Sequence, residues 1–365
     1  MRNFNQSSFW ARLHIDFPLL IGLLLISLLS FAVLYSAKEE MAILQRQIIR
    51  LSLAYGLLFV VAQIPPRILK SAAIWLYSFS LLLLFIVLAM GAISKGAQRW
   101  LDIGFIRFQP AELMKIALPL MLAHYLEGHT LPPKLGALIL PSIMIITPVL
   151  LIALQPDLGT AILIASTGLL VIFFSGVRWR YIGYLAGLCL AGAPLFWYAL
   201  RDYQRQRILM LLNPESDPLG RGYHIIQSKI AIGSGGIYGK GWLNGTQSHL
   251  EYLPERTTDF IFAVFGEEFG LVGISLLLLL YLYIIIRGLY IGVQAQTTFA
   301  RLLVGSFTMT FFVYIFVNIA MVTGILPVVG IPLPLISYGG TSMVTLMVSF
   351  GMLMSVQTHR TLLHK

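Results

Sequence analysis

The sequence predicts an all-α, polytopic membrane protein of about ten transmembrane helices, and two observations lead to this class. Of the 365 residues, 58% are hydrophobic and only 11% are charged, whereas a soluble domain carries roughly a quarter charged residues. The apolar residues also gather in runs nearly free of charge, such as Phe17–Ala37, Ile74–Gly91 and Ile274–Ile286. A bilayer core about 30 Å thick needs about 20 such residues in a helix, so the chain is long enough for about ten spans.

The spans are expected to follow one another with short connections, except for one long loop before the eighth. The first apolar run is too long for a signal peptide and lacks a clear cleavage site, so we interpret it as an uncleaved span. Pro156 and Asp157 form a tight break between the fifth and sixth spans. The predicted spans are residues 17–37, 43–63, 73–91, 111–126, 136–154, 159–176, 181–200, 260–286, 301–323 and 339–357.

Positive charge predicts the orientation of the spans, because Lys and Arg are enriched in short cytoplasmic segments. With both termini in the cytoplasm, one set of segments holds most of these residues, namely Arg2, Arg12, Arg67, Lys70, Lys134, Arg178, Arg180, Arg287, Arg301, Arg360 and Lys365. The opposite short loops carry only Lys38, Lys95, Arg99 and Arg107. The long loop, residues 201–258, therefore faces outward. The net charge of +10 reflects topology rather than nucleic-acid binding.

The remaining features narrow the architecture. The sequence shows no internal repeat, so residues 1–365 are expected to form one integral membrane domain. Residues 324–340 are rich in Pro and Gly yet almost wholly apolar. Irregular backbone at membrane depth survives only where protein or a cavity covers it, so this segment is predicted to be re-entrant or cavity-lining. The single cysteine, Cys189, excludes a disulfide framework within the chain.

Ionisable side chains at membrane depth mark candidate sites, because charge there is costly and usually faces the bundle interior or a watery cavity. Arg50 lies in the second span, where an arginine can also snorkel to the surface. Glu112 and Lys115 are three residues apart on the fourth span and share one helix face. They either form a self-satisfied ion pair or line a charged cavity. Arg99 and Trp100 precede them and add a cationic, aromatic rim that suits an anionic lipid headgroup.

Four acids near helix starts have competing interpretations. Asp157 follows Pro156 and either caps the next helix or also faces the outer cavity. Asp259 ends the outer loop, where the dipole of the following helix favours an acid. It is either a helix cap alone or an ionised carboxylate fit to act as a general base. Glu267 and Glu268 lie about two turns deeper and diverge by about 100°, so they are expected to satisfy backbone or basic groups within the bundle.

Motifs spread along the chain carry a family resemblance. They are Ser94–Trp100, Phe108–Glu112 with Lys115, Gln155–Thr160, Tyr203–Arg207, Asp217–Gly220, Tyr223–Gly236, Leu253–Phe260, Gly266–Gly270 and Asn318–Ser342. Together they resemble the SEDS family of shape, elongation, division and sporulation proteins, most closely its rod-shape-determining members. The resemblance covers essentially the whole chain, and the last stretch is long and family-specific.

The resemblance implies a bundle similar to GT-C transferases with one long periplasmic loop. It further implies a peptidoglycan glycosyltransferase that polymerises lipid II into β-1,4 glycan strands at the outer face of the bacterial inner membrane, maintaining rod shape during elongation. The implied partners are lipid II, the growing strand, the class B penicillin-binding transpeptidase and other membrane proteins of the elongation complex. The family's essential acid falls on Asp259. The other residues divide into cavity groups (Glu112, Lys115, Asp157, Arg50, Arg99 and Trp100) and supporting groups (Glu267, Glu268, Ser337, Gly339 and Gly340).

The implied chemistry needs few protein groups. An α-linked diphosphate leaves while a β-1,4 bond forms, so the configuration inverts and no enzyme nucleophile is required. Asp259 would take the proton of the attacking hydroxyl, and Lys115, Arg99 or a divalent cation such as Mg²⁺ or Mn²⁺ would stabilise the diphosphate. The sequence itself shows no metal cluster and requires no cofactor. Two alternatives stay open: a lipid II flippase, and a scaffold for the penicillin-binding protein that performs no catalysis.

Overall fold

The structure is a computed structural model that describes residues 13–94, 97–102, 107–199, 202–212, 221–249, 253 and 255–359. Both chain ends, Lys95 and parts of the long loop lie outside these residues, so the predicted cytoplasmic ends are not described. The elements in order are α2 (Phe17–Lys38), α3 (Met41–Ala62), α4 (Pro66–Met90), β1 (Ala92–Ser94), β2 (Ala97–Asp102), β3 (Arg107–Phe108), α5 (Pro110–Glu127), α6 (Leu135–Leu154), α7 (Leu158–Phe174), α8 (Trp179–Ala199), α9 (Asp202–Leu212), α10 (Arg221–Gly235), α11 (Thr246–His249), α12 (Ile261–Val293), α13 (Thr298–Val322) and α14 (Thr341–Thr358).

Each of the ten predicted spans corresponds to one helix, α2 to α8 and α12 to α14. Within the described ranges, α2, α3, α4, α6, α12, α13 and α14 are long and apolar enough to cross a membrane, and α7 is a shorter apolar helix. The chain is therefore a multi-pass helical membrane protein. Pro66 and Pro110 each occupy the first turn of their helix. Backbone N–H groups in this turn have no acceptor within the helix, so proline, which lacks the N–H, is tolerated there.

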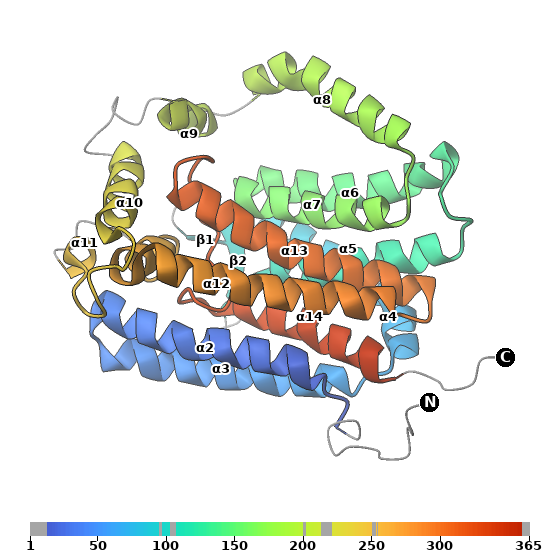
Figure 1. Ribbon diagram of the computed structural model, residues 1–365. Helices are drawn as coiled ribbons and strands as arrows, with labels where there is room; N and C mark the ends of the chain where they lie inside the picture. The colour runs from blue at the N-terminus through green and yellow to red at the C-terminus, as the bar shows by residue number, and fades with distance from the viewer. Residues whose placement is uncertain are drawn as a thin grey trace.

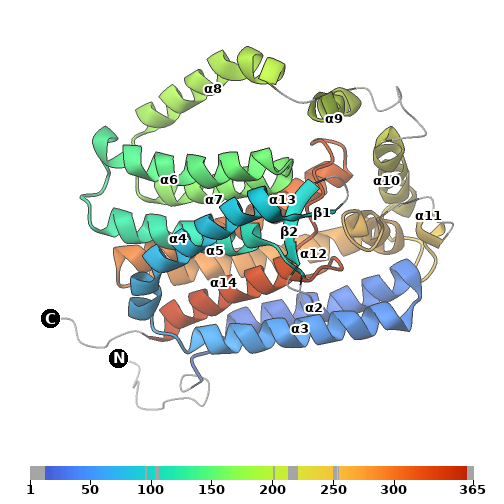
Figure 2. The ribbon, with the colours of Figure 1, turned by 180° about the vertical axis from the view of Figure 1, so that it is seen from behind.

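The spanning helices run roughly alongside one another in a bundle (Figure 1). Helices α2 and α3 form one side, and α4 to α7 lie on the other side of α12, α13 and α14; the reverse view shows the same order (Figure 2). The closest pairings are α3 with α14, α4 with α5, α12 with α13 and α13 with α7. Helix α13 is buried along most of its length, so the protein core follows this helix.

A small antiparallel sheet is the main departure from the all-α expectation. Strands β1, β2 and β3 pair in that order, with Ala92 opposite Trp100 and Leu101 opposite Phe108. The sequence interpretation treated this stretch as a loop, because strands of two to six residues carry no clear periodic signal. Arg99 and Trp100 belong to β2, which contacts α5, so the sheet fixes their position beside this helix.

The long outer loop is also more ordered than its sequence suggested. Its described parts contain α9, α10 and α11, which gather at one end of the bundle (Figure 1). Helix α10 packs on α12. The turn after α10 inserts at a break in α12, where Gly270 adopts φ 61° and ψ −163°. There Lys240 N donates to Glu267 O (3.0 Å) and Leu271 N donates to Gly236 O (3.0 Å), so the turn satisfies groups that the break exposes.

Residues 324–340 run without regular helix between α13 and α14 and are mostly covered by neighbouring helices. Their carbonyl groups accept hydrogen bonds from side chains of three different helices. Ser30 Oγ donates to Ile336 O (2.9 Å), and Tyr281 OH donates to Pro334 O (2.7 Å). The third donor is a side chain of α13, described below. Irregular backbone deep in the bundle is stable here because protein donors replace the missing helix bonds.

Candidate active site

One polar cavity brings together residues from distant parts of the chain. Its volume is about 560 Å³. Of the predicted site residues, it is lined by Arg99, Trp100, Glu112, Lys115, Asp157, Asp259, Gly339 and Gly340. Ser337, Arg50, Glu267 and Glu268 are not among its lining residues. Of the predicted cavity group, only Arg50 does not line this cavity. Of the predicted supporting group, Gly339 and Gly340 line it.

Four helices begin at this cavity. Its lining includes residues from the first turns of α5 and α7, Asp259 just before α12, and Thr341 and Ser342 at the start of α14. A helix N-terminus carries unpaired N–H groups and the positive end of the helix dipole. The convergence of four such ends creates a positive potential that does not depend on side-chain charge, and this potential favours an anionic group in the cavity.

Glu112 and Lys115 form a buried ion pair that also lines the cavity. Lys115 Nζ donates to Glu112 Oε1 (2.7 Å), and Thr345 Oγ1 of α14 donates to Glu112 Oε2 (2.9 Å). The ammonium also lies 5.3 Å from the centre of the Tyr314 ring. The structure agrees with both interpretations of Glu112 and Lys115. The two side chains form an ion pair with each other, and both also line the cavity.

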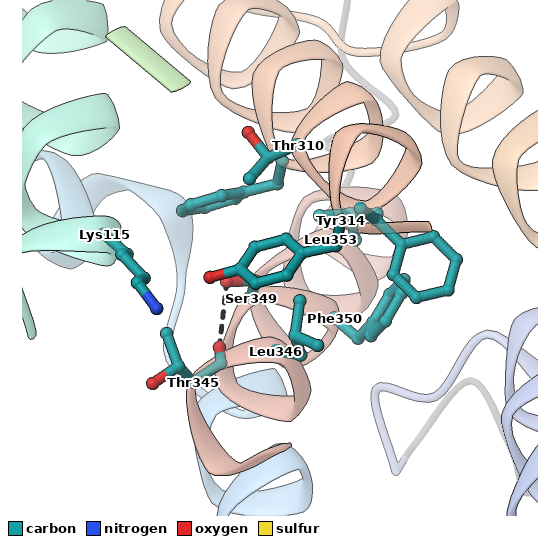
Figure 3. A pocket seen from close by; sticks show the side chains of 10 residues that line it. Lys115, Thr310, Tyr314, Thr345, Leu346, Ser349, Phe350 and Leu353 are labelled. Carbon is teal, nitrogen blue, oxygen red and sulfur yellow. Dashed lines mark hydrogen bonds between the residues drawn. The ribbon is translucent and has the colours of Figure 1, made fainter. Parts of the chain in front are cut away.

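A smaller apolar pocket lies beneath this pair (Figure 3). The Lys115 amine points toward Thr345 and the Tyr314 hydroxyl, while Phe350 and Leu353 close the far side (Figure 3). Ser349 Oγ donates to the Thr345 carbonyl (3.0 Å), so α14 satisfies its own polar groups at this level. Lys115 and Tyr314 line both this pocket and the polar cavity, so the two spaces adjoin at these side chains.

Asp157 both caps α7 and contacts the cation of the small sheet. Its carboxylate accepts from Thr160 N (3.2 Å) and Thr160 Oγ1 (3.0 Å). Gln109 Nε2 donates to Oδ2 (3.3 Å), and Arg99 Nε lies 3.5 Å from the same oxygen. Arg99 also donates through Nη2 to the Pro156 carbonyl (2.6 Å). The capping interpretation is confirmed, and the carboxylate also lines the cavity.

Asp259 lines the cavity, one residue before the N-cap of α12. The N-cap position belongs to Phe260, so the interpretation of Asp259 as the capping residue is wrong by one position. The helix starts later than the sequence indicated because residues 255–260 form turns instead. The Asp259 side chain is partly exposed, and the close approach of Gly330, which has φ +75°, leaves room for its carboxylate.

The backbone around Asp259 is held by the irregular segment. Asn318 Nδ2 donates to Asp259 O (2.9 Å) and to Ile331 O (2.7 Å). Ser337 Oγ donates to the carbonyl of residue 258 (2.5 Å), and Tyr338 N donates to the carbonyl of residue 257 (2.8 Å). Three bonds therefore tie residues 257–259 to the irregular segment or α13. Ser337 acts on the site through this backbone, because its side chain does not line the polar cavity.

Arg50 lies behind the cavity wall. Its guanidinium is stacked over the Tyr338 ring, 4.4 Å from the ring centre. A side chain at Gly340, which does line the cavity, would approach the same guanidinium. Arg46, four residues earlier, instead bonds the Ala42 carbonyl of its own helix and is exposed. The structure thus associates Arg50, and not Arg46, with the cavity wall.

Glu267 and Glu268 lie outside the cavity and support the outer loop. Glu267 is fully buried and accepts from Lys240 Nζ (2.7 Å), Thr246 Oγ1 (3.0 Å) and Gln247 N (3.1 Å). Glu268 accepts from Ser36 of α2. The expectation that this acid pair satisfies basic and backbone groups is confirmed for Glu267. The pair anchors the loop that leads to Asp259.

The charged side chains of the cavity leave it slightly anionic. Among the described lining residues, Arg99 and Lys115 face three acids, Glu112, Asp157 and Asp259. The described residues contain no group of three or more His, Cys, Asp or Glu side chains placed to hold a metal ion. The helix starts at the cavity add positive potential that counters part of this negative charge.

Several site residues escaped the sequence analysis. Thr345 and Tyr314 complete the surroundings of Lys115, Gln109 and Thr160 bind Asp157, and Asn318 fixes the Asp259 backbone. A polar side chain inside an apolar helix was the available signal for Asn318. For Thr345 no signal exists, because hydroxyl groups commonly bond their own helix, as Thr345 also does.

Comparison with known proteins places these features in a family. Residues 10–362 match the cell cycle protein family of FtsW, RodA and SpoVE. The chain is 54% identical over 365 residues to the peptidoglycan glycosyltransferase MrdB of Escherichia coli K12, covering 100% of this chain and 99% of that protein.

Two solved structures are also similar. One chain from a peptidoglycan synthase complex, described as coordinating polymerization and crosslinking, superposes with a TM-score of 0.81 at 35% identity, covering 94% of this chain and 97% of its own length. The rod shape determining protein RodA of Thermus thermophilus superposes with a TM-score of 0.72 at 31% identity, with coverage of 94% and 96%. The helix arrangement is thus shared with these proteins.

Proposed function

This chain belongs to the FtsW, RodA and SpoVE family of cell cycle proteins and is a peptidoglycan glycosyltransferase, and we propose that it polymerises lipid II into β-1,4 glycan strands with Asp259 as general base. The observation that carries the proposal is the position of Asp259. It lines a cavity that also holds both lining cations, Arg99 and Lys115. A base and an anion site then share one cavity, as transfer from a diphosphate requires.

The reaction joins two sugars and releases a diphosphate. The 4-hydroxyl of the acceptor attacks the anomeric carbon of the growing strand, its proton passes to Asp259, and the bond from that carbon to the diphosphate oxygen breaks. The α-linked donor becomes a β-linked product, so the attack comes from the face opposite the leaving group. Asp259 would serve this step as a partly exposed carboxylate just before a helix start.

The remaining cavity groups would hold the diphosphate. Arg99 and Lys115 are already paired with acids, so their net contribution is reduced. The four helix starts add positive potential, which the Asp157 carboxylate partly offsets at the start of α7. Arg50, stacked on Tyr338 behind Gly340, is the next cation available. We assign to this combined field the stabilisation of the leaving diphosphate.

A divalent cation would enter this site with the substrate. The cavity lining carries one more acid than it has cations, and a diphosphate adds further negative charge. Mg²⁺ is commonly held by one or two carboxylates together with substrate phosphates. Asp157 is the lining carboxylate that is neither paired to Lys115 nor assigned as the base. We therefore propose that Mg²⁺ or Mn²⁺ binds as part of the lipid diphosphate complex rather than in a resident protein site.

The cellular setting follows from the same proposal. The chain would form one integral domain of the bacterial inner membrane, with both termini cytoplasmic and the loop of residues 201–258 in the periplasm. Its partners would be lipid II, the growing strand, the class B penicillin-binding transpeptidase and other membrane proteins of cell elongation. The similarity to a chain from a peptidoglycan synthase complex supports this assignment of partners.

The test is polymerisation of labelled lipid II by the purified chain, with and without the transpeptidase. Asp259→Asn keeps the shape of the side chain and removes the base, so we expect a folded protein whose rate is lower by roughly 10²- to 10⁴-fold. The matched control is Glu40→Gln, the same chemical change at an exposed acid paired with Lys38, which should polymerise normally. Normal polymer from Asp259→Asn would refute the base assignment, and headgroup movement across vesicles without polymer would indicate a flippase instead.

A further inference from the structure

A second cavity adjoins the first at Asp259. It has a volume of about 170 Å³ and lies beneath the helices of the outer loop. Its lining residues are Met210, His224, Ile225, Glu255, Asp259, Phe260 and Val328. Asp259 and Val328 also line the larger cavity, so these two side chains form the boundary between the cavities. The proposed base therefore faces two separate spaces.

The two cavities differ in charge. Both cations found in the described lining, Arg99 and Lys115, belong to the larger cavity. The described lining of the smaller cavity holds two acids, Glu255 and Asp259, together with apolar side chains and one imidazole. An anionic diphosphate is disfavoured there by repulsion from the carboxylates. The smaller cavity suits a neutral, polar group.

His224 lines this cavity and brings an imidazole to it. Its Nδ1 is buried and has no hydrogen-bond partner among the described residues. The ring is stacked against Phe260, with 5.8 Å between the ring centres and 20° between the planes, so its orientation is fixed by packing. Buried polar atoms without a partner are rare in folded proteins, so this imidazole lies beside the cavity with hydrogen-bonding capacity that no described residue uses.

Burial lowers the pKa of His224 from its ordinary value of 6.5, and the nearby Glu255 opposes this effect only in part. A neutral imidazole has one nitrogen that donates and one that accepts. It can bond a sugar hydroxyl or an N-acetyl group through either role without adding charge.

The polymerisation reaction requires a place for such a group. The two reacting ends differ, because the donor end carries its diphosphate on the reacting carbon, whereas the acceptor reacts through the 4-hydroxyl of its terminal N-acetylhexosamine. The acceptor's own diphosphate is one further sugar away. The reacting end of the acceptor is thus a neutral sugar ring that must lie against the base, outside the space that the donor diphosphate fills.

We propose that the smaller cavity binds the terminal N-acetylhexosamine of the acceptor and that His224 positions this sugar by hydrogen bonding. The inference rests on the proposed function. A volume of about 170 Å³ corresponds to on the order of ten water molecules, which matches one substituted sugar ring. The donor then occupies the larger cavity, and Asp259 at the boundary takes the proton of the acceptor hydroxyl.

A single coupling between two modified substrates tests this assignment. The donor is a lipid II that lacks the 4-hydroxyl on its terminal sugar. The acceptor is a lipid II whose anomeric phosphate is replaced by a non-cleavable phosphonate. The wild-type chain then forms one tetrasaccharide and releases one lipid diphosphate, so the KM of each substrate is measured separately at saturating concentrations of the other. No tetrasaccharide from the wild type would refute the proposed function itself.

Three variants distinguish positioning from packing. His224→Ala should raise the KM of the acceptor by roughly 3- to 10-fold, the effect of one lost hydrogen bond, and leave the KM of the donor unchanged. His224→Gln retains hydrogen-bonding groups and should restore most of the acceptor affinity. Ile230→Ala, at an exposed position of the same helix, should keep both constants. Equal acceptor KM in His224→Ala and wild type, a rise in donor KM instead, or no rescue by glutamine would overturn the assignment while leaving the proposed function intact.

Discussion

The side chain of Asn318 donates a hydrogen bond to the backbone carbonyl of Asp259 at 2.9 Å, although the two residues are 59 positions apart. The same amide group donates to the carbonyl of Ile331 at 2.7 Å. One buried side chain of α13 therefore holds both the residue that precedes α12 and the irregular segment opposite it. The position of the proposed base depends on this bridge.

We expect Asn318→Leu to lower kcat for polymerisation more than it raises KM. Each carbonyl left without its donor in a buried setting costs about 1–3 kcal/mol, and the backbone at Asp259 would shift to find another partner. Thr323→Val is the matched control on the same helix, because the Thr323 hydroxyl bonds only carbonyls of its own helix. Lipid II polymerisation and thermal unfolding are measured together. A lower melting temperature with unchanged kcat would show that the bridge serves stability alone.

A second prediction separates the two roles of the pair formed by Glu112 and Lys115. Lys115→Met leaves a buried carboxylate without its cation, which costs about 3–5 kcal/mol. The double variant Glu112→Gln with Lys115→Met removes both charges, so we expect it to recover much of the lost stability. If the pair also contacts the diphosphate, polymerisation stays low in the double variant. Recovery of activity together with stability would show that the two residues only hold each other.

The sequence predicted the helices far better than the site. Apolar runs and their lengths mark the spans directly, and the first predicted span, residues 17–37, differs from α2 by a single residue. Asp259, Glu112, Lys115 and Asp157 were grouped through family motifs, and the structure places all four on one cavity. The length and hydropathy of a span depend only on consecutive residues, so a single sequence is enough to predict where the spans lie.

The unpredicted parts all depend on contacts between distant segments. The small sheet exists because β2 pairs with two short neighbours, and no hydropathy pattern reports such pairing. Asn318 acts across 59 residues, and Thr345 reaches Glu112 across 233. The predicted start of this span, residue 260, differs from the start of α12 by one residue. The turns before α12, which the sequence did not indicate, are held by bonds from Ser337 and Tyr338.

The third prediction concerns the turn that joins α10 to the break in α12. Gly239 has φ +78°, and a Cβ atom there would overlap the Glu268 carbonyl. Gly239→Ala should therefore destabilise the protein by more than about 1 kcal/mol and increase proteolysis in the loop of residues 201–258. Gly233→Ala is the matched control, because it lies inside α10 with open space around it, and it should leave stability unchanged or raise it by up to about 1 kcal/mol. Equal melting temperatures and equal protease sensitivity for the two variants would contradict the proposed anchoring role of the turn.

The fourth prediction is a pH dependence caused by His224. Burial lowers the pKa of this imidazole below 6.5 in the folded protein, whereas the unfolded chain takes up its proton near the ordinary value of 6.5. Between the two values the unfolded state binds more protons, so the contribution of His224 to stability is lost as the pH falls below 6.5. Glu255 and Asp259 are the carboxylates that share its cavity, and both are present in every variant compared.

The measurement is the difference in melting temperature between the wild type and His224→Gln, followed from pH 7.5 to pH 5.5. Glutamine does not titrate, so the contributions of the other ionisable groups largely cancel in this difference. We expect the wild type to lose stability relative to His224→Gln as the pH falls through this range. A difference that stays constant would show that the imidazole titrates alike in both states, and a change of the opposite sign would show that Glu255 outweighs burial. Either result would contradict our assignment of a neutral His224 imidazole to the smaller cavity.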